Sequence, residues 1–182
     1  MQRCVAFLRG INLAGQRRVP MGQLRDVLEQ AGYEEVQTLL QSGNVVLSAG
    51  ADPKALERKL AKTLSGEFGF EIQVIVRTRD ELAEILERDP FAGEADDPAR
   101  YQVSLLSAEP DPKGVQELEA AVVSPERVVI SGREVYAWHP GGVGRSKLAK
   151  LINDRQLGVG VTARNWRTLT RLLEMADRQT DR

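Results

Sequence analysis

The sequence has little of several residue types on which common kinds of site depend. It contains one cysteine, Cys4, and one histidine, His139. A lone cysteine excludes an internal disulfide and a zinc site built from cysteines, and a lone histidine argues against a transition-metal centre. No Gly-x-Ser-x-Gly segment accompanies His139, which argues against a serine-hydrolase triad. The sequence therefore predicts no metal and no cofactor.

Long apolar runs and a strong net charge are also missing. No run approaches the roughly 18 apolar residues of a membrane-spanning helix, and Cys4–Leu8 is too short for a signal-peptide core. We therefore expect a cytoplasmic protein that has no membrane partner. The net charge of −1 argues against a strongly basic nucleic-acid binder, and the central strands lack the aromatic signature of RNA-binding sheets.

Charge is nevertheless distributed unevenly along the chain. Residues 1–25 hold five arginines and no acid, and residues 145–171 hold seven basic residues against one acid. Residues 80–97 hold eight acids against one arginine. If the two basic ends meet in space, they form a positive surface. The alternative is that each is a solvated face with no ligand.

The first part of the chain predicts the order β-α-β-β-α-β. The hydrophobic spacing and the turn residues predict a strand at 4–8, a helix at 21–31, a hairpin at 36–47, a helix after Asp52-Pro53 and a strand at 70–76. This order is typical of the split βαβ, ferredoxin-like arrangement. An acidic helix at 80–87 and a loop at 89–99 follow.

The second part repeats the pattern. We expect a strand at 101–106, a helix at 111–122, a hairpin at 127–138, a helix from Ser146, a short strand at 158–161 and a final helix capped by Thr162. The predicted fold class is α+β, with two ferredoxin-like halves whose antiparallel or mixed sheets carry helices on one face. The predicted domains are a first subdomain at 1–79, an acidic helix and linker at 80–100, and a second subdomain with the C-terminal helix at 101–182.

Two stretches of the first half carry candidate site residues. Arg9 and Asn12 follow the first strand, and Arg18 precedes the next helix. Arginine offers a planar fork of donors to phosphate or carboxylate, whereas a structural reading pairs Arg9 with an acid and lets Asn12 cap the loop. The turn Gln41–Asn44 contains Gln41, Ser42 and Asn44, more polar groups than a short turn needs. These side chains either bind a ligand or bond to the turn's own backbone.

Two stretches of the second half also carry candidate site residues. Pro140–Lys147 is a glycine-rich loop that leads into a helix at Ser146 and Lys147, without the spacing of a P-loop. It is either a phosphate loop or a plain connection. In Thr162–Trp166, Thr162 and Asn165 suit a capping pair. Arg164 would then lie in a first helical turn, where cations are disfavoured unless an anion arrives.

Five motifs, taken in order, resemble the bacterial domain-of-unknown-function family 1697. They are Leu8–Asn12, Val19–Met21, Gln41–Val46, Gly144–Leu148 and Thr162–Trp166. The resemblance spans essentially the whole chain and implies a cytoplasmic α+β protein of two related subdomains, with no established activity. The family's motif residues correspond here to Arg9, Asn12, Gln41, Ser42, Asn44, Ser146, Lys147, Thr162, Arg164 and Asn165.

Three functional hypotheses follow. The first is binding of an anionic, phosphate-bearing ligand, either a nucleotide or nucleic acid, in a cleft between the two halves lined by the residues above and Arg18. The second is an enzyme that acts on a phosphorylated metabolite, with Lys147 or Ser42 as the reacting group. The third is a structural or interaction module whose motif residues brace the halves. The sequence leaves the ligand, catalysis and oligomeric state open.

Overall fold

The computed structural model describes residues 1–178, so the end of the predicted second subdomain, 179–182, lies outside the described residues. The chain divides into two compact units. Unit 1 holds Met1–Glu84 and the C-terminal residues from Arg171 on, and unit 2 holds Ile85–Thr170. The chain passes between them inside two helices, α3 (Arg79–Arg88) and α7 (Trp166–Asp177). Domains bounded at residues 79 and 101 stay a prediction.

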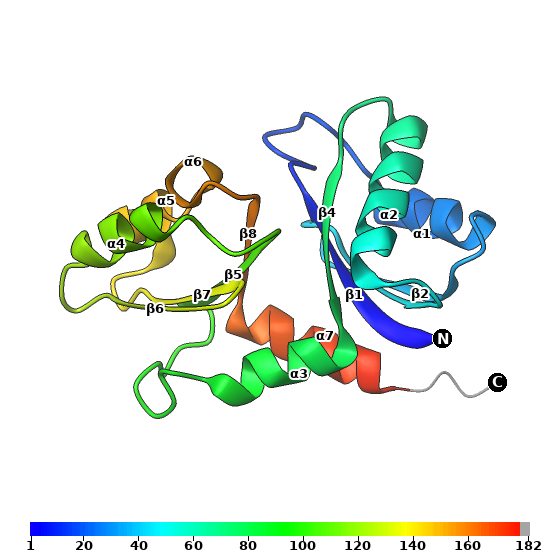
Figure 1. Ribbon diagram of the computed structural model, residues 1–182. Helices are drawn as coiled ribbons and strands as arrows, with labels where there is room; N and C mark the ends of the chain where they lie inside the picture. Colours follow the sequence, from blue (N-terminus) through cyan, green and yellow to red (C-terminus); the bar gives the residue numbers. More distant parts are fainter. Residues whose placement is uncertain (179–182) are drawn as a thin grey trace. The chain divides into compact units, whose positions relative to one another are not determined.

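Unit 1 is built around a four-stranded antiparallel sheet with the strand order β2-β3-β1-β4 (Figure 1). Its elements are β1 (Gln2–Arg9), α1 (Met21–Gln30), β2 (Glu34–Leu39), β3 (Asn44–Ala49), α2 (Pro53–Phe68) and β4 (Gln73–Thr78). This order and pairing are those of the split βαβ arrangement. The predicted α+β fold class is confirmed for this unit.

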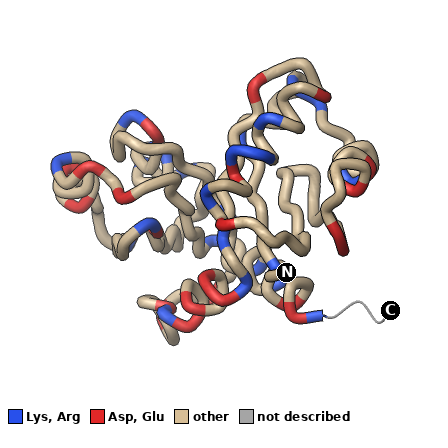
Figure 2. The backbone as a smooth tube through the Cα atoms, turned by 45° about the vertical axis from the view of Figure 1, so that its right-hand side comes forward, with Lys and Arg blue, Asp and Glu red and all other residues tan. Residues whose placement is uncertain are grey.

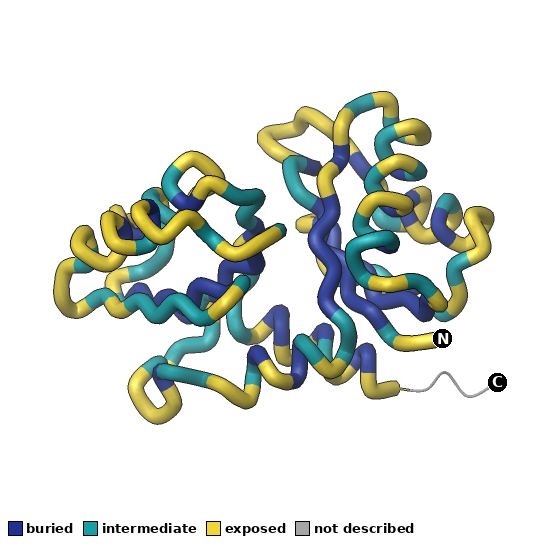
Figure 3. The backbone as a smooth tube through the Cα atoms, in the orientation of Figure 1, coloured by how far each residue is buried: buried dark blue, intermediate teal, exposed yellow. Residues whose placement is uncertain are grey.

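Alternation along the strands and four-residue spacing along α2 create the core of unit 1. Cys4, Ala6 and Leu8 of β1 belong to one apolar cluster with the buried leucines of α1 and α2. Each buried leucine stabilises the fold by about 1.5–3 kcal/mol relative to an exposed one. The central strand β3 is buried along its whole length (Figure 3). Helix α2 begins as predicted, because Oδ2 of Asp52 accepts a hydrogen bond from the N–H of Ala55 at 3.1 Å.

The last strand of unit 1 begins later than the alternation at 70–76 predicts. The N–H of Ile72 donates to Oγ of Ser65 at 2.9 Å, so this segment is tied to the end of α2 and not to the sheet. Pairing with β1 starts at Gln73, opposite Arg9, and continues to Thr78, opposite Cys4. The predicted start of the strand was wrong because Phe70 and Ile72 continue the apolar alternation although they precede β4.

Unit 2 repeats the arrangement, with an antiparallel sheet in the order β6-β7-β5-β8 (Figure 1). Its elements are β5 (Tyr101–Leu106), α4 (Pro112–Ala120), β6 (Arg127–Ser131), β7 (Glu134–Trp138), the 3-10 turn η1 (Val143–Arg145), α5 (Lys147–Leu151), α6 (Asp154–Leu157) and β8 (Val161–Asn165). Leu118, Leu148 and Leu157 bring α4, α5 and α6 into one apolar cluster with β5 and β7. Two short helices replace the single second helix of unit 1.

The start of the final helix differs from the prediction. Thr162 does not cap it, because Thr162 and Arg164 lie on β8, opposite Leu105 and Val103 of β5. The cap is Asn165, whose Oδ1 accepts from the N–H of Thr168 at 2.8 Å. Arg164 therefore lies in a strand, and its predicted place in a first helical turn was wrong.

Candidate functional site

Asn12 connects the loop after β1 to the turn between β2 and β3. Its Nδ2 donates to the backbone oxygen of Gln41 at 2.7 Å and to that of Val19 at 3.2 Å. Its Oδ1 accepts from the N–H of Val19 at 2.9 Å. Both amide hydrogens and the side-chain oxygen thus have partners inside unit 1. Asn12 braces these two loops, which is the structural reading of this residue.

The Gln41–Asn44 turn is held largely by its own groups. Asn44 is fully buried, and its Nδ2 donates to the backbone oxygen of Leu39 at 2.8 Å and to Oγ of Ser42 at 3.0 Å. Gly43 has a φ of +80°, and a β-carbon there would lie 2.8 Å from Cβ of Leu8. The buried amide and the close approach of the backbone explain Asn44 and Gly43 without a ligand.

The predicted arginines of unit 1 have different environments. Arg9 ends β1 and donates from Nη1 to Oε1 of Gln73 on β4. Arg18 is exposed in the loop before α1. Its neighbour Arg17 lies 6.0 Å from the ring centre of Phe70, within the range of a cation–π contact. These and the other charged residues are marked along the chain in Figure 2.

The predicted residues on β8 also bond within unit 2. Nη1 of Arg164 donates to Oγ1 of Thr162 at 2.8 Å and to the backbone oxygen of Ala163 at 2.9 Å. Burial lowers the pKa of Arg164 to about 10, which leaves this side chain charged at neutral pH. Trp166, next to Asn165, stacks on Tyr101 with ring centres 4.4 Å apart.

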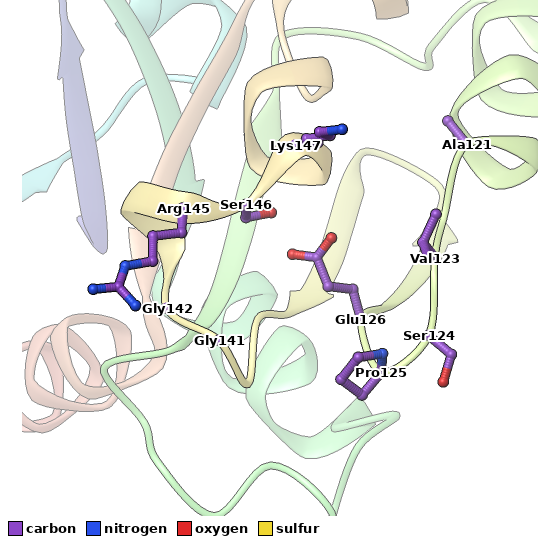
Figure 4. A pocket seen from close by; sticks show the side chains of 10 residues that line it. All are labelled: Ala121, Val123, Ser124, Pro125, Glu126, Gly141, Gly142, Arg145, Ser146 and Lys147. Atoms are coloured by element: carbon purple, nitrogen blue, oxygen red, sulfur yellow. The ribbon is translucent and has the colours of Figure 1, made fainter.

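Unit 2 contains a pocket of about 420 Å³ (Figure 4). One wall is Ala121–Glu126, the connection between α4 and β6, and its apolar part is Ala121, Val123 and Pro125. The other wall comes from Gly141–Lys147, the glycine-rich loop and the start of α5. Ser146 and Lys147 are the two predicted site residues that line this pocket. Its volume is that of a small-molecule site.

The glycine-rich loop carries two basic residues beside the pocket. Arg145 and Lys147 are exposed, and neither forms an ion pair with any of residues 1–178. Lys147 projects toward the wall at Ala121, whereas Arg145 projects to the other side of the loop (Figure 4). Ser146 lies between them and caps α5 as predicted, since its Oγ accepts from the N–H of Ala149 at 2.8 Å. The cap fixes the backbone that carries both cations.

A carboxylate faces the same pocket from the opposite wall. Glu126 lines it, and Oε1 of Glu126 lies 3.0 Å from Nδ1 of His139. Because a carboxylate only accepts hydrogen bonds, Nδ1 carries the proton of this bond. The His139 side chain is fully buried, and its Nε2 has no hydrogen-bond partner among the described residues. The pocket therefore combines a cation, a carboxylate held in place and an apolar wall.

Sequence reasoning missed Glu126 and considered His139 only as an isolated residue. A signal for the pair was present in the predicted hairpin at 127–138. Arg127 lies opposite Trp138 in the β6–β7 pairing, so the residue before the first strand must approach the residue after the second. Glu126 and His139 hold those two positions.

Residues 1–178 contain no group of three or more His, Cys, Asp or Glu side chains placed to hold a metal ion. In the same part of the chain, every helix is too short or too polar to span a bilayer.

Comparison with known proteins places the chain in a family. The sequence pattern of the proteins of unknown function called DUF1697 matches residues 1–136. The chain belongs to the DUF1697 family. The matched part of this DUF1697 protein includes the Ala121–Glu126 wall of the pocket and ends before Gly141–Lys147.

A solved structure resembles this DUF1697 protein over nearly its whole length. It is the conserved bacterial protein SP0830 from Streptococcus pneumoniae, with a TM-score of 0.75 and 20% sequence identity. The likeness covers 97% of this chain and 99% of that chain, and at this identity it shows the fold alone. No curated protein matches the sequence.

Proposed function

We propose that this DUF1697 protein binds a small phosphate-bearing ligand in the pocket of unit 2. The observation that carries the proposal is the exposed cation Lys147 on a glycine-rich loop that lines a pocket of about 420 Å³, with Arg145 on the same loop adding positive charge beside it. Neither cation is neutralised by an acid among residues 1–178, so their charge is available to a ligand. A lysine ammonium is a common partner of phosphate groups.

The loop itself supports close contact with such a group. Gly141 and Gly142 line the pocket and add no side chain between the backbone and a ligand. Gly142 has a φ of +91°, a conformation that other residues rarely adopt, so the loop path depends on it. Apolar Val123 and Pro125 on the facing wall suit the uncharged part of a ligand.

The size of the pocket favours a mononucleotide or sugar phosphate over a nucleic-acid chain. Pockets of this volume enclose drug-sized molecules, whereas binding of a nucleic-acid backbone rests on many cations along an extended surface. The net charge of −1 also argues against the extended surface. The proposal is thus narrower than the sequence-based hypothesis, since it uses Ser146 and Lys147 of the predicted residues.

Thermal unfolding with paired probes tests the proposal. AMP and adenosine share a nucleoside and differ in the phosphate, so AMP alone should raise the unfolding temperature of the full chain at low salt. Lys147→Ala should abolish most of this rise. Lys150→Ala is the matched control, because Lys150 is an exposed lysine of the same helix that does not line the pocket. No stabilisation by AMP, or equal loss in both variants, would contradict the proposal.

A structural role for the motif residues of unit 1 is the second candidate function. The observation that favours it is the full set of hydrogen bonds made by the Asn12 amide within the unit. In this view Asn12 and Asn44 stabilise unit 1. Such a role is compatible with a ligand site in unit 2, because the two sets of residues are separate.

A further inference from the structure

Glu126 gives the pocket a feature that a simple anion site would avoid. It is the one carboxylate among the residues that line the pocket, and its carboxylate projects into the space between the two walls, with Ser146 and Lys147 on the other side (Figure 4). Its side chain is 19% exposed, so it is reachable from the pocket but largely enclosed. A carboxylate in this place repels a phosphate at short range and attracts hydrogen-bond donors.

His139 holds this carboxylate in one orientation. Nδ1 of His139 donates to Oε1 of Glu126 at 3.0 Å, and the other oxygen, Oε2, has no partner among residues 1–178. The histidine is itself fixed by its backbone. Its N–H donates to the oxygen of Arg100 at 3.1 Å, and its oxygen accepts from the N–H of Gly142 at 2.8 Å. Glu126 is thus tied to the loop that carries Lys147.

We propose that Glu126 is a specificity residue that accepts a hydrogen bond from a hydroxyl or ammonium group of the phosphate-bearing ligand, and that His139 positions Glu126. The inference rests on the proposed function and names the ligand class. The ligand is a phosphomonoester that carries an O–H or N–H donor a few bonds from its phosphate, as hydroxyalkyl, sugar and aminoalkyl phosphates do. Lys147 contacts the phosphate, and Oε2 of Glu126 accepts from the donor.

The geometry explains why a fixed acceptor discriminates. A largely enclosed carboxylate that meets a ligand without a donor loses water and gains no hydrogen bond, which penalises that ligand. A ligand with a donor replaces the lost water with a charge-assisted hydrogen bond. The imidazole prevents Glu126 from turning away to avoid the penalty, so the preference depends on His139 as well as on Glu126.

Calorimetric titration of the full chain with two pairs of phosphates tests the inference. Glycerol 3-phosphate carries hydroxyls that propyl phosphate lacks, and 2-aminoethyl phosphate carries an ammonium group that ethyl phosphate lacks. We expect about ten-fold tighter binding of the donor-bearing member of at least one pair, the effect of one hydrogen bond to a charged group. The pair that shows the preference tells whether the donor is a hydroxyl or an ammonium.

Variants assign the preference to its residues. Glu126→Ala should bring the two affinities of the pair within about two-fold, while binding of propyl phosphate is retained or strengthened because a repulsive charge is gone. Glu119→Ala is the control, since Glu119 is exposed on α4 and does not line the pocket. His139→Leu removes the donor to Glu126 and should lose the preference. His139→Asn, which keeps a donor, should retain most of it.

The outcomes separate this inference from the proposed function. If neither AMP nor any of the four phosphates binds, the proposed function is wrong and the inference falls with it. If AMP stabilises the protein but none of the four phosphates binds, the proposed function stands and the inference is overturned. If both members of each pair bind equally, with Lys147-dependent affinity, the proposed function stands and the inference is overturned. A preference that persists in Glu126→Ala also overturns it. Should His139→Leu fail to fold, the Glu126→Ala comparison decides alone.

Discussion

Asn12 and Gln41 belong to two different sequence motifs and are joined by a hydrogen bond of 2.7 Å from Nδ2 of Asn12 to the backbone oxygen of Gln41. The same amide holds Val19 through two more bonds. A side chain whose donors and acceptor are all used within its own unit contributes to stability. Motif residues that look like a ligand site in the sequence can therefore be there to hold two loops together.

The first prediction concerns Asn12. Asn12→Gly should lower the free energy of unfolding, measured in urea, by about 1–3 kcal/mol. The change removes three hydrogen bonds and leaves backbone groups of Val19 and Gln41 without their side-chain partner. Glycine is the better test residue here, since the φ of 51° would strain alanine. Gln16→Gly in the same exposed loop is the control. An unchanged or raised stability in Asn12→Gly would contradict the bracing role.

The second prediction concerns the contact between α4 and α6. A β-carbon on Gly114 would lie 1.9 Å from the backbone oxygen of Gln156, which is part of a helix and has little room to shift. Gly114→Ala should therefore destabilise the protein by more than about 2 kcal/mol. In Gly66→Ala the new methyl group meets nothing within 4 Å, and the helical position should gain about 0.5–1 kcal/mol. Equal effects in urea unfolding would show that the two helices are not packed this closely.

The third prediction concerns the start of α7. Asn165→Ala removes the acceptor of the Thr168 N–H and should cost about 0.5–2 kcal/mol. Asn165→Asp keeps the acceptor and adds a negative charge at the helix N-terminus, so its stability should match or exceed that of the natural protein. The pair is measured by thermal unfolding. A loss of the same size in both variants would mean that the cap is not what Asn165 contributes.

Much of the fold could be predicted from the sequence because its signals are local. The apolar run Cys4–Leu8 and the Asp52-Pro53 helix start each depend on neighbouring residues, and the strand and the helix start were both confirmed. Val161–Asn165 could not be assigned in this way, because Thr162 suits a helix cap as well as a strand. Pairing with β5, almost sixty residues earlier in the chain, decides it.

In the pocket, too, residues with a local sequence signal could be predicted, whereas residues brought together by strand pairing were missed. Lys147 and Ser146 attract notice in the sequence because they follow a run of glycines. Glu126 and His139 are ordinary when read singly, and only the pairing of β6 with β7 brings them together. The hairpin was predicted, so the pair could have been inferred from the residues that flank it. The direction of the Glu126 side chain into the pocket could not.

The fourth prediction concerns Cys4. Burial raises the pKa of its thiol to about 11, with a further rise from Glu81 and an opposing effect of Arg3. At pH 8 the thiol is protonated and enclosed, so a chromogenic disulfide reagent should label the folded protein far more slowly than the urea-unfolded protein. Fast labelling of the folded protein at pH 8 would contradict the buried position.

The raised pKa of the Cys4 thiol also makes the free energy of unfolding depend on pH. The folded thiol keeps its proton between the ordinary pKa of 9.0 and about 11, while the unfolded thiol loses it. The folded state then binds more protons, so the contribution of Cys4 is fully present below pH 9 and is lost as the pH rises through this window. In Cys4→Ala, unfolding free energy should fall less steeply over the same pH range.

The central claim is that a phosphate-bearing ligand binds in the pocket of unit 2, and the location of binding tests it most directly. Titration of the ¹⁵N-labelled full chain with AMP, followed by amide chemical shifts, reports every backbone position at once. The account predicts that the largest shifts fall on Gly141–Lys147 and Val123–Glu126, and that Lys147→Ala suppresses them while Lys150→Ala does not. Shifts centred on other parts of the chain, or no shifts at millimolar AMP, would contradict it.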